Sequence, residues 1–290
     1  MKSITFLGPV GTTFSTIAYE RLAKEYHLPS ITNGNCIPAT TNSEIIDLVI
    51  QHGGYGAIAM ETAAGGRVAE ALESFIKLLD YTETHTPCPL RILGAIKMKL
   101  HFCLMTKSPH TISDVSAVIA HPKALDACKK NIQKLNLPSH SSTSNGEAAR
   151  CVAEDETCSH YAAIGPVSAA EYYHLAVLNE SFEDKDAYTT FFLLGQNNQE
   201  ATIGAANRAL IIFTLMHEPG SLVQALLPFQ KAQLNLIQIH SMYSDTNEYR
   251  FAIEIEVASV QITSFNDVLT DFKKHVAHHI FFGPFEIRNI

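Results

Sequence analysis

The order of apolar and polar positions predicts alternating strands and helices from the start of the chain to about residue 195. Short apolar runs are followed by segments whose apolar residues recur every three or four positions, as on one face of an amphipathic helix. This alternation favours mostly parallel sheets with helices on both faces. The expected strands are residues 4–7, 55–60, 115–120 and 162–164, and the expected helices are residues 14–24, 68–79, 124–135 and 168–173.

The last third of the chain predicts a separate small unit. The polar stretch 196–207 contains glycine and is typical of a linker. After it the pattern changes to strand, helix, strand, strand, helix and strand, which is the ferredoxin-like order βαββαβ. The expected strands are residues 209–215, 237–243, 250–257 and 280–287, and the expected helices are residues 222–232 and 265–276.

Length and composition narrow the class of protein. The chain has 290 residues, which suits two or three compact units, and its 46% hydrophobic and 17% charged residues indicate a folded chain. The net charge of −8 argues against nucleic-acid binding, which normally needs a basic face. No export signal is visible, and no apolar run reaches the roughly 18 residues of a membrane span. We therefore expect a cytoplasmic protein that binds neither nucleic acid nor a membrane.

The cysteines and histidines form no recognisable metal-binding motif. The six cysteines are scattered without a Cys-x-x-Cys pair, and in a cytoplasmic chain we expect them to be reduced thiols. The neighbouring His278 and His279 would point apart on either a helix or a strand. We therefore predict no metal site.

Five segments at strand ends or helix starts could carry chemistry. The loop 8–15 follows a strand and opens a helix, where glycines allow a tight turn and free N–H groups can bind a carboxylate or phosphate. Glu61 comes at the C-terminal end of a strand, where ligands bind in open α/β sheets. The others are His121 before a helix, the hydroxyl run 141–144 before another helix, and residues 188–192 entering an apolar strand.

Each of these segments also has a purely structural explanation. The hydroxyls of 8–15 and 141–144 could cap helices. Glu61 could be a surface carboxylate, His121 a structural histidine, and the threonines of 188–192 simply good strand formers. No one segment decides between structure and function, so the order of the whole set becomes the informative feature.

Taken in order, the segments resemble the motifs of the prephenate dehydratase family. Residues 8–15 are similar to GPxGT[FY]S with one additional threonine, Glu61 with its flanks resembles PxEN, and residues 120–125 resemble SHPQAL. Ser142-Thr143, followed by residues 147–149, resembles ST…AA. Residues 162–175 resemble AAIAS…AAELYGL, and residues 186–195 resemble NxTRFLVIG. In the last third, 218–223 and 235–239 are similar to the PGALV loop and the NLTKI strand of the family's ACT domain.

The resemblance implies an α/β fold with two functional parts. The first is a two-lobed catalytic region like the type II periplasmic binding proteins, and the second is a βαββαβ ferredoxin-like ACT domain. The expected boundaries are 1–195 for the dehydratase-like domain, 196–207 for the linker and 208–290 for the ACT regulatory domain. Within the first domain, lobe 1 is expected at about 1–90 and 175–195, and lobe 2 at about 91–174.

The family resemblance also implies a cofactor-free lyase that converts prephenate to phenylpyruvate in phenylalanine biosynthesis. Thr189 matches the threonine of the family's TRF element, which is expected to donate a hydrogen bond or proton to the leaving hydroxyl. Glu61 is the second candidate catalytic residue. Helix starts at 11–15 and near Thr143 are expected to bind the substrate carboxylates. The full set of expected substrate-binding residues is Gly11, Thr12, Thr13, Ser15, Thr62, Gly66, Arg67, His121, Ser142, Thr143, Thr190 and Phe191.

Several positions depart from the family pattern. Thr190 stands where the TRF element has arginine, and Thr62 stands where PxEN has asparagine. The first change removes a cation expected to meet a substrate carboxylate. Arg67, expected on the helix after the two glycines, or Lys123 could supply charge instead. A divergent prephenate decarboxylase and a non-catalytic sensor of small carboxylates are therefore kept as alternatives.

The ACT resemblance implies an amino-acid effector, phenylalanine in this family, and a homodimer or homotetramer. The family's ESRP element is His240–Tyr243 here, and only Ser241 is retained, so we expect a weakened or altered response. The expected effector-binding residues are Gly220, Ser221, Leu222, Val223, Asn235, Leu236, His240 and Ser241.

Overall fold

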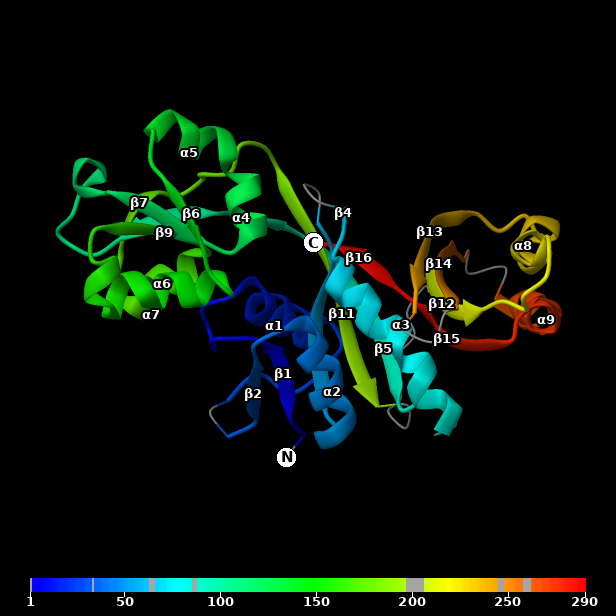
Figure 1. The fold of residues 1–290 in the computed structure, drawn as a ribbon. Coiled ribbons are helices and arrows are strands. Elements are labelled where there is room, and N and C mark those ends of the chain that lie inside the picture. The colour runs from blue at the N-terminus through cyan, green and yellow to red at the C-terminus, as the bar shows by residue number, and fades with distance from the viewer. Residues whose placement is uncertain are drawn as a thin grey trace. The chain divides into compact units, whose positions relative to one another are not determined.

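The computed structural model describes residues 2–32, 34–62, 66–84, 88–196, 206–244, 248–257 and 262–290. The chain forms two compact units, each assembled from separate stretches of sequence (Figure 1). The first contains Met1–Val68, Ile96–Leu193 and Asn289–Ile290, and the second contains Ala69–Ala95 and Leu194–Arg288. Among the described helices, none is both long and apolar enough to cross a membrane.

The larger sheet of the described residues has seven strands. Its strands are β1 Ile4–Leu7, β2 Cys36–Ala39, β3 Tyr55–Thr62, β4 Gly66–Arg67, β5 Leu90–Leu100, β11 Ala187–Gln196 and β16 Ile287–Asn289. The helices between its first three strands are α1 Phe14–Glu25 and α2 Asn42–His52. The strand order is β16-β5-β11-β3-β1-β2, with β4 paired to β3. Strand β1 runs parallel to β2 and β3, and α1 and α2 pack on β1 and β3. Both faces of the central strands are therefore buried, and Ile4, Phe6, Ala57 and Ile58 are fully enclosed.

A second sheet of five strands lies in the middle of the described sequence. Its elements are β6 Cys103–Thr106, η1 Ile112–Asp114, β7 Ala117–Ala120, α4 Pro122–Ala127, α5 Lys129–Leu135, β8 Ser139–Ser141, α6 Asn145–Glu154, η2 Glu156–Cys158, β9 Tyr161–Gly165, α7 Val167–Tyr173 and β10 Ala176–Asn179. The order is β10-β6-β9-β7-β8. Strand β7 runs parallel to β8 and β9, whereas β6 runs antiparallel to β9 and β10. The sheet is therefore mixed rather than mostly parallel.

The C-terminal sheet has the predicted ferredoxin-like order. Its elements are β12 Arg208–Thr214, α8 Ser221–Lys231, β13 Leu236–Tyr243, β14 Tyr249–Glu256, α9 Ile262–Phe272, η4 Lys273–His275 and β15 His278–Phe285. The described strands pair antiparallel in the order β13-β14-β12-β15. A core that includes Phe213, Phe229, Ile253 and Phe272 joins the sheet to α8 and α9. The prediction of an α/β fold with a terminal βαββαβ unit is confirmed.

Helix α3, Ala69–Thr84, packs within the second unit although it lies early in the sequence. It contacts β12, β14 and β15, and Phe75 meets Phe282 edge to face with ring centroids 5.3 Å apart. The buried Arg250 forms a two-pronged ion pair with Asp80, including an Nη1 to Oδ2 bond of 2.8 Å. The expected domain boundaries at 195 and 208 stay a prediction, and residues 197–205 of the expected linker lie outside the described residues.

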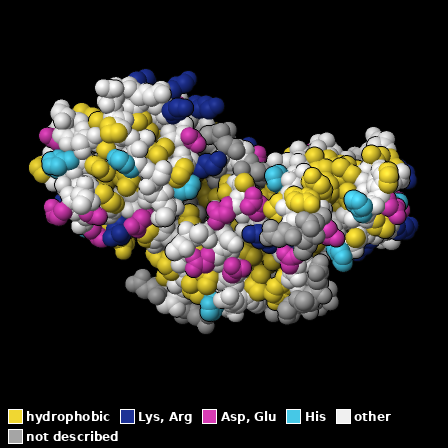
Figure 2. Space-filling view, in the orientation of Figure 1, with side chains coloured by type: hydrophobic (Ala, Val, Ile, Leu, Met, Phe, Trp, Pro, Cys, Tyr) yellow, Lys and Arg dark blue, Asp and Glu magenta, His cyan; other side chains and the backbone are white. Residues whose placement is uncertain are grey.

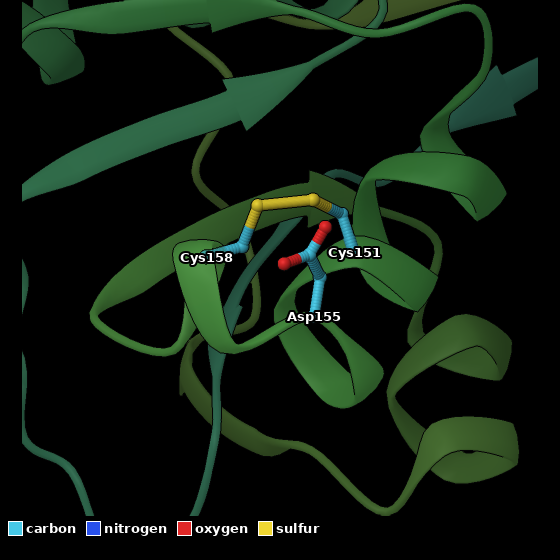
Figure 3. A group of neighbouring side chains, drawn as sticks. All are labelled: Cys151, Asp155 and Cys158. Carbon is cyan, nitrogen blue, oxygen red and sulfur yellow. A yellow bond between two sulfur atoms is a disulfide. The ribbon is translucent and has the colours of Figure 1, made fainter.

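Besides the expectation of mostly parallel sheets, two further expectations from the sequence are wrong. Arg67 is not on a helix, because β4 pairs antiparallel with β3 and places Arg67 opposite Glu61. The six cysteines are not all free thiols, because Cys151 and Cys158 form a disulfide between α6 and η2 (Figure 3). The turn at Asp155 brings these two residues together, and sequence spacing alone does not reveal such a pairing.

Candidate functional site

The loop 8–15 connects β1 to α1 and is held by its own hydroxyl groups. Thr13 is the N-cap of α1: its Oγ1 accepts a 3.3 Å hydrogen bond from the Thr16 N–H and donates one of 2.6 Å to the Leu7 carbonyl. Oγ1 of Thr12 donates to the Pro9 carbonyl at 3.1 Å. The capping explanation therefore holds for Thr13, and anion binding at the start of α1 stays a prediction.

The first turn of α6 packs directly against this loop. A Cβ atom placed on Gly146 would lie 2.8 Å from Cδ of Pro9 and 3.1 Å from Cγ2 of Thr13, and closer still to Oγ1 of Thr12. Only a residue without a side chain allows such an approach. Ser144 caps α6 by accepting a 3.0 Å hydrogen bond from the Glu147 N–H. The starts of two helices, α1 and α6, thus meet within the first unit.

Two further strands, β7 and β9, end beside this contact. His121 follows β7 and caps α4, its Nδ1 accepting from the Lys123 N–H at 3.3 Å. The His121 N–H in turn donates to Oδ1 of Asn145 at 3.1 Å. A Cβ on Gly165, the last residue of β9, would lie 3.2 Å from Cβ of Asn145. Asn145 therefore ties the ends of β7 and β9 to the start of α6.

The expected hydroxyl ligands before α6 take different positions. The N–H of Ser142 donates to the Ala120 carbonyl at 2.9 Å, which extends the pairing of β7 with β8. Ser142 is half-buried and Thr143 is exposed, whereas Ser144, which caps the helix, is buried. Of the two expected ligands in this run, Ser142 and Thr143, Thr143 is therefore the more open to a ligand.

Glu61 lies at the C-terminal end of β3 in a hairpin with β4. It is exposed and stands opposite Arg67, while Thr62 stands opposite Gly66. Gly66 has a φ of 63°, a left-handed conformation that favours glycine. The side chain of Arg67 lies outside what the structure describes, as do residues 63–65.

Thr189 and Thr190 lie on β11, between β5 and β3 in the larger sheet. Consecutive strand residues point to opposite faces, so only one of the two can face a given side of the sheet. Both are buried, with 5% and 7% of their surface exposed. Phe191 is buried as well and follows on the same face as Thr189.

Sequence reasoning did not identify three residues that the structure places at this junction. Gly146 and Asn145 form the first turn of α6, and Tyr172 on α7 lies 3.8 Å from the Cβ position of Gly11. The Asn-Gly pair before the alanines of α6 is the sequence feature that marks this contact, but such a pair usually predicts a turn. Its use here, as a close contact in a helix start, depends on a partner more than 130 residues away in the chain.

The expected effector residues lie on two elements of the C-terminal sheet. Gly220, with a φ of 82°, precedes α8, and Val223 in its first turn is 61% exposed. His240 and Ser241 are consecutive on the edge strand β13, where His240 is half-buried and Ser241 is exposed. These two side chains therefore face opposite sides of the strand. The side-chain amide of Asn235 donates to Glu256 at 3.3 Å.

A sequence model described as Prephenate dehydratase matches residues 4–199. The chain belongs to the prephenate dehydratase family. It is 27% identical over 244 residues to the prephenate dehydratase of Methanocaldococcus jannaschii, covering 82% of this chain and 83% of that protein. The chain spans less than half the length of the plant arogenate dehydratases that it also matches.

Two solved structures share the fold of this family member. Prephenate dehydratase from Arthrobacter aurescens in complex with L-Phe has a TM-score of 0.81 at 23% identity, covering 98% of this chain and 90% of that one. GqqA, described as a novel type of quorum quenching acylase, has a TM-score of 0.74 at 21% identity and covers 97% of both chains. The fold of the family therefore occurs in proteins with differently named activities, so the chemistry must be argued from the site.

Proposed function

We propose that this member of the family is a prephenate dehydratase that forms phenylpyruvate for phenylalanine biosynthesis. The observation that carries the proposal is the contact of two helix starts, the loop 8–15 before α1 and the first turn of α6 around Gly146. Each start presents free N–H groups and the positive end of a helix dipole. Prephenate carries two carboxylates, and this arrangement suits a dianion.

The reaction needs the removal of two groups from the substrate ring. The bond between the ring and its carboxylate breaks, and carbon dioxide leaves. The released electron pair aromatises the ring and expels the hydroxyl from the opposite carbon. Thr189 would donate a hydrogen bond or proton to that hydroxyl as it departs as water. Glu61, at the neighbouring strand end, is the second candidate catalytic group.

Incubation of the purified chain with prephenate tests the proposal. We expect phenylpyruvate to form in step with the loss of prephenate. Thr189→Ala should reduce turnover by about 10²–10⁴-fold, the range for loss of a positioned proton donor, whereas Thr189→Ser keeps a hydroxyl and should retain most activity. Thr5→Ala is the matched control, because it removes a buried hydroxyl from β1 of the same sheet at a position outside the expected site.

A prephenate decarboxylase is the second candidate function. Thr190 favours it, because this buried position of β11 holds a neutral side chain where the family motif has arginine. Loss of prephenate without phenylpyruvate would establish decarboxylation alone. No loss above the uncatalysed background would leave the sensor of small carboxylates as the remaining interpretation.

We also propose that the C-terminal unit binds phenylalanine and mediates a homodimer or homotetramer. The Arthrobacter aurescens relative is described in complex with L-Phe. Hydrophobic side chains gather on the surface over β13 and β14, among them Ile237, Ile239, Tyr243 and Tyr249 (Figure 2). Equilibrium dialysis with phenylalanine and light scattering of the full chain test the two parts. The cytoplasmic location stays a prediction.

A further inference from the structure

Cys151 and Cys158 form a disulfide at a turn that the proposed reaction does not use. Cys151 lies on α6 and Cys158 on η2, seven residues apart in sequence, with their Cα atoms 5.9 Å apart. This separation falls within the range of about 4.4–6.8 Å for disulfides, so both residues fit the bond without moving the backbone. Cys151 is half-buried, whereas Cys158 is buried with 6% of its surface exposed.

Three of the four remaining thiols are poorly suited to exchange, and the fourth, the half-buried Cys36, has no cysteine partner with which to form a disulfide. All four are described, and Cys103 and Cys128 are buried. Burial, with smaller contributions from nearby carboxylates, raises the pKa of Cys103 to about 11 and raises the pKa of Cys128 as well. Burial also raises the pKa of Cys88. Because the thiolate is the reactive form, the chemistry of this chain concentrates at the pair on α6 and η2.

We propose that Cys151 and Cys158 are a reversible thiol–disulfide site that exchanges with low-molecular-weight disulfides. In oxidation, the thiolate of Cys151 attacks one sulfur of the small disulfide and releases its first thiol. The thiolate of Cys158 then attacks Sγ of Cys151 and releases the second thiol. The two protein thiols lose two protons and two electrons, and the small disulfide gains both. Reduction by an incoming thiol starts at Cys151, because it is the less buried of the two residues.

The carboxylate of Asp155 slows this exchange. One of its carboxylate oxygens lies within 4.8 Å of both sulfur atoms, and Figure 3 shows the group beside the bond. Its Oδ1 accepts hydrogen bonds from the N–H and hydroxyl of Thr157 at 2.9 and 2.7 Å. The pKa of Asp155 is therefore lowered, chiefly by the Thr157 hydroxyl, and the charged carboxylate disfavours a neighbouring thiolate. Arg150 does little to offset this charge, because it pairs with Glu147 and Glu154.

The test measures thiols in the full chain equilibrated with reduced or oxidised glutathione. Alkylation in denaturant, read by intact mass, should give six labels per chain in the reduced state and four in the oxidised state. Cys158→Ser should trap the mixed disulfide of Cys151, with five labels in the reduced state and four labels plus one glutathione in the oxidised state, whereas Cys151→Ser should keep five labels in both states. Cys36→Ser, which alters a half-buried free cysteine, is the matched control and should still lose two labels on oxidation.

A second variant tests the role of the carboxylate. Asp155→Asn keeps the oxygen that accepts from Thr157 and removes the charge. A unit negative charge about 5 Å away in water lowers the fraction of thiolate about fourfold. Without that charge, alkylation of the reduced native pair should become about two- to fourfold faster. An unchanged rate would contradict this role of Asp155.

Three results would overturn the proposal. In the first, the pair keeps both thiols in oxidised glutathione, so no disulfide forms by exchange. In the second, the disulfide survives excess reductant without denaturant, so the bond is permanent. Stoichiometric uptake of Zn²⁺ by the reduced chain, lost in Cys151→Ser and in Asp155→Asn, would assign the three residues to a metal instead. Reversible loss and recovery of two labels supports the exchange site.

Discussion

Replacement of Gly146 by alanine tests the contact between the two helix starts. Gly146 is the second residue of α6, and the added Cβ would meet Cδ of Pro9 at 2.8 Å and Cγ2 of Thr13 at 3.1 Å, with Oγ1 of Thr12 nearer still. Thr12 and Thr13 are almost fully buried, so the loop has little room to retreat. We expect Gly146→Ala to separate α6 from the loop 8–15.

The size of the effect follows from two opposing contributions. Overpacking of a buried site costs about 1–3 kcal/mol. Alanine favours a helix over glycine by at most about 1 kcal/mol, and by less in the first turn. The net loss in the free energy of unfolding is about 1–2 kcal/mol, which lowers the melting temperature by roughly 2–8 °C for a unit of this size.

Thermal unfolding followed by circular dichroism measures the change. Gly34→Ala is the control, because a Cβ at Gly34 meets no atom within 4 Å. Thr12→Ala removes the nearest clashing atom, so Gly146→Ala in that background should cost less than in the native chain, with a coupling of about 0.5–1.5 kcal/mol. If Gly146→Ala melts like Gly34→Ala, or if the two substitutions add without coupling, the helix starts are not in the contact described.

Three other substitutions or reactions have defined outcomes. Asp80→Asn should destabilise the second unit by about 1–3 kcal/mol, because it removes the charge that pairs with the buried Arg250 at Asp80. The Arg250 hydrogen bonds lower the pKa of Asp80, so the native chain should lose this stability as pH falls below about 4 while Asp80→Asn does not, and urea titrations at several pH values compare them. Ser144→Ala should cost about 1 kcal/mol in the same assay, because the N-cap of α6 is lost; an unchanged midpoint would contradict the cap. Iodoacetamide should label Cys103 far more slowly than Cys36 in the native chain, and equal rates would refute the raised pKa.

Periodicity predicted the strands and helices whose apolar positions are regularly spaced. The sequence expectation for 4–7 coincides with β1, and the order of the C-terminal elements is the one expected. Strand β2, helix α2 and the long strand β5 were not predicted. The short β2 has only four residues, with a proline among them, so it shows no regular alternation. Strand β5 does alternate apolar and polar residues over 96–100, and this strand signal was missed.

The candidate site was predictable in its loops but not in its contacts. The motif order pointed to Thr13, Glu61, His121 and Thr189, which lie at a helix start, at strand ends or in a strand of the first unit. Which hydroxyl caps a helix and which faces a ligand depends on backbone geometry, and Ser144 rather than Thr143 proved to be the cap. The Cys151 pairing and the hairpin at Arg67 likewise arise from tertiary structure that local spacing does not encode.

The packing of α3 has a consequence for exchanging the C-terminal sheet between family members. A fragment that ends near residue 195 keeps α3 but loses β12, β14 and β15, against which the helix packs. The buried side chains of Leu72, Phe75, Ile76 and Leu79 would then lose apolar neighbours that belong to the other fragment. A chimera made at the linker therefore has to carry a matched α3, with Asp80 or its equivalent facing the arginine of the new sheet. The exchangeable part is thus the sheet together with a helix encoded more than a hundred residues earlier.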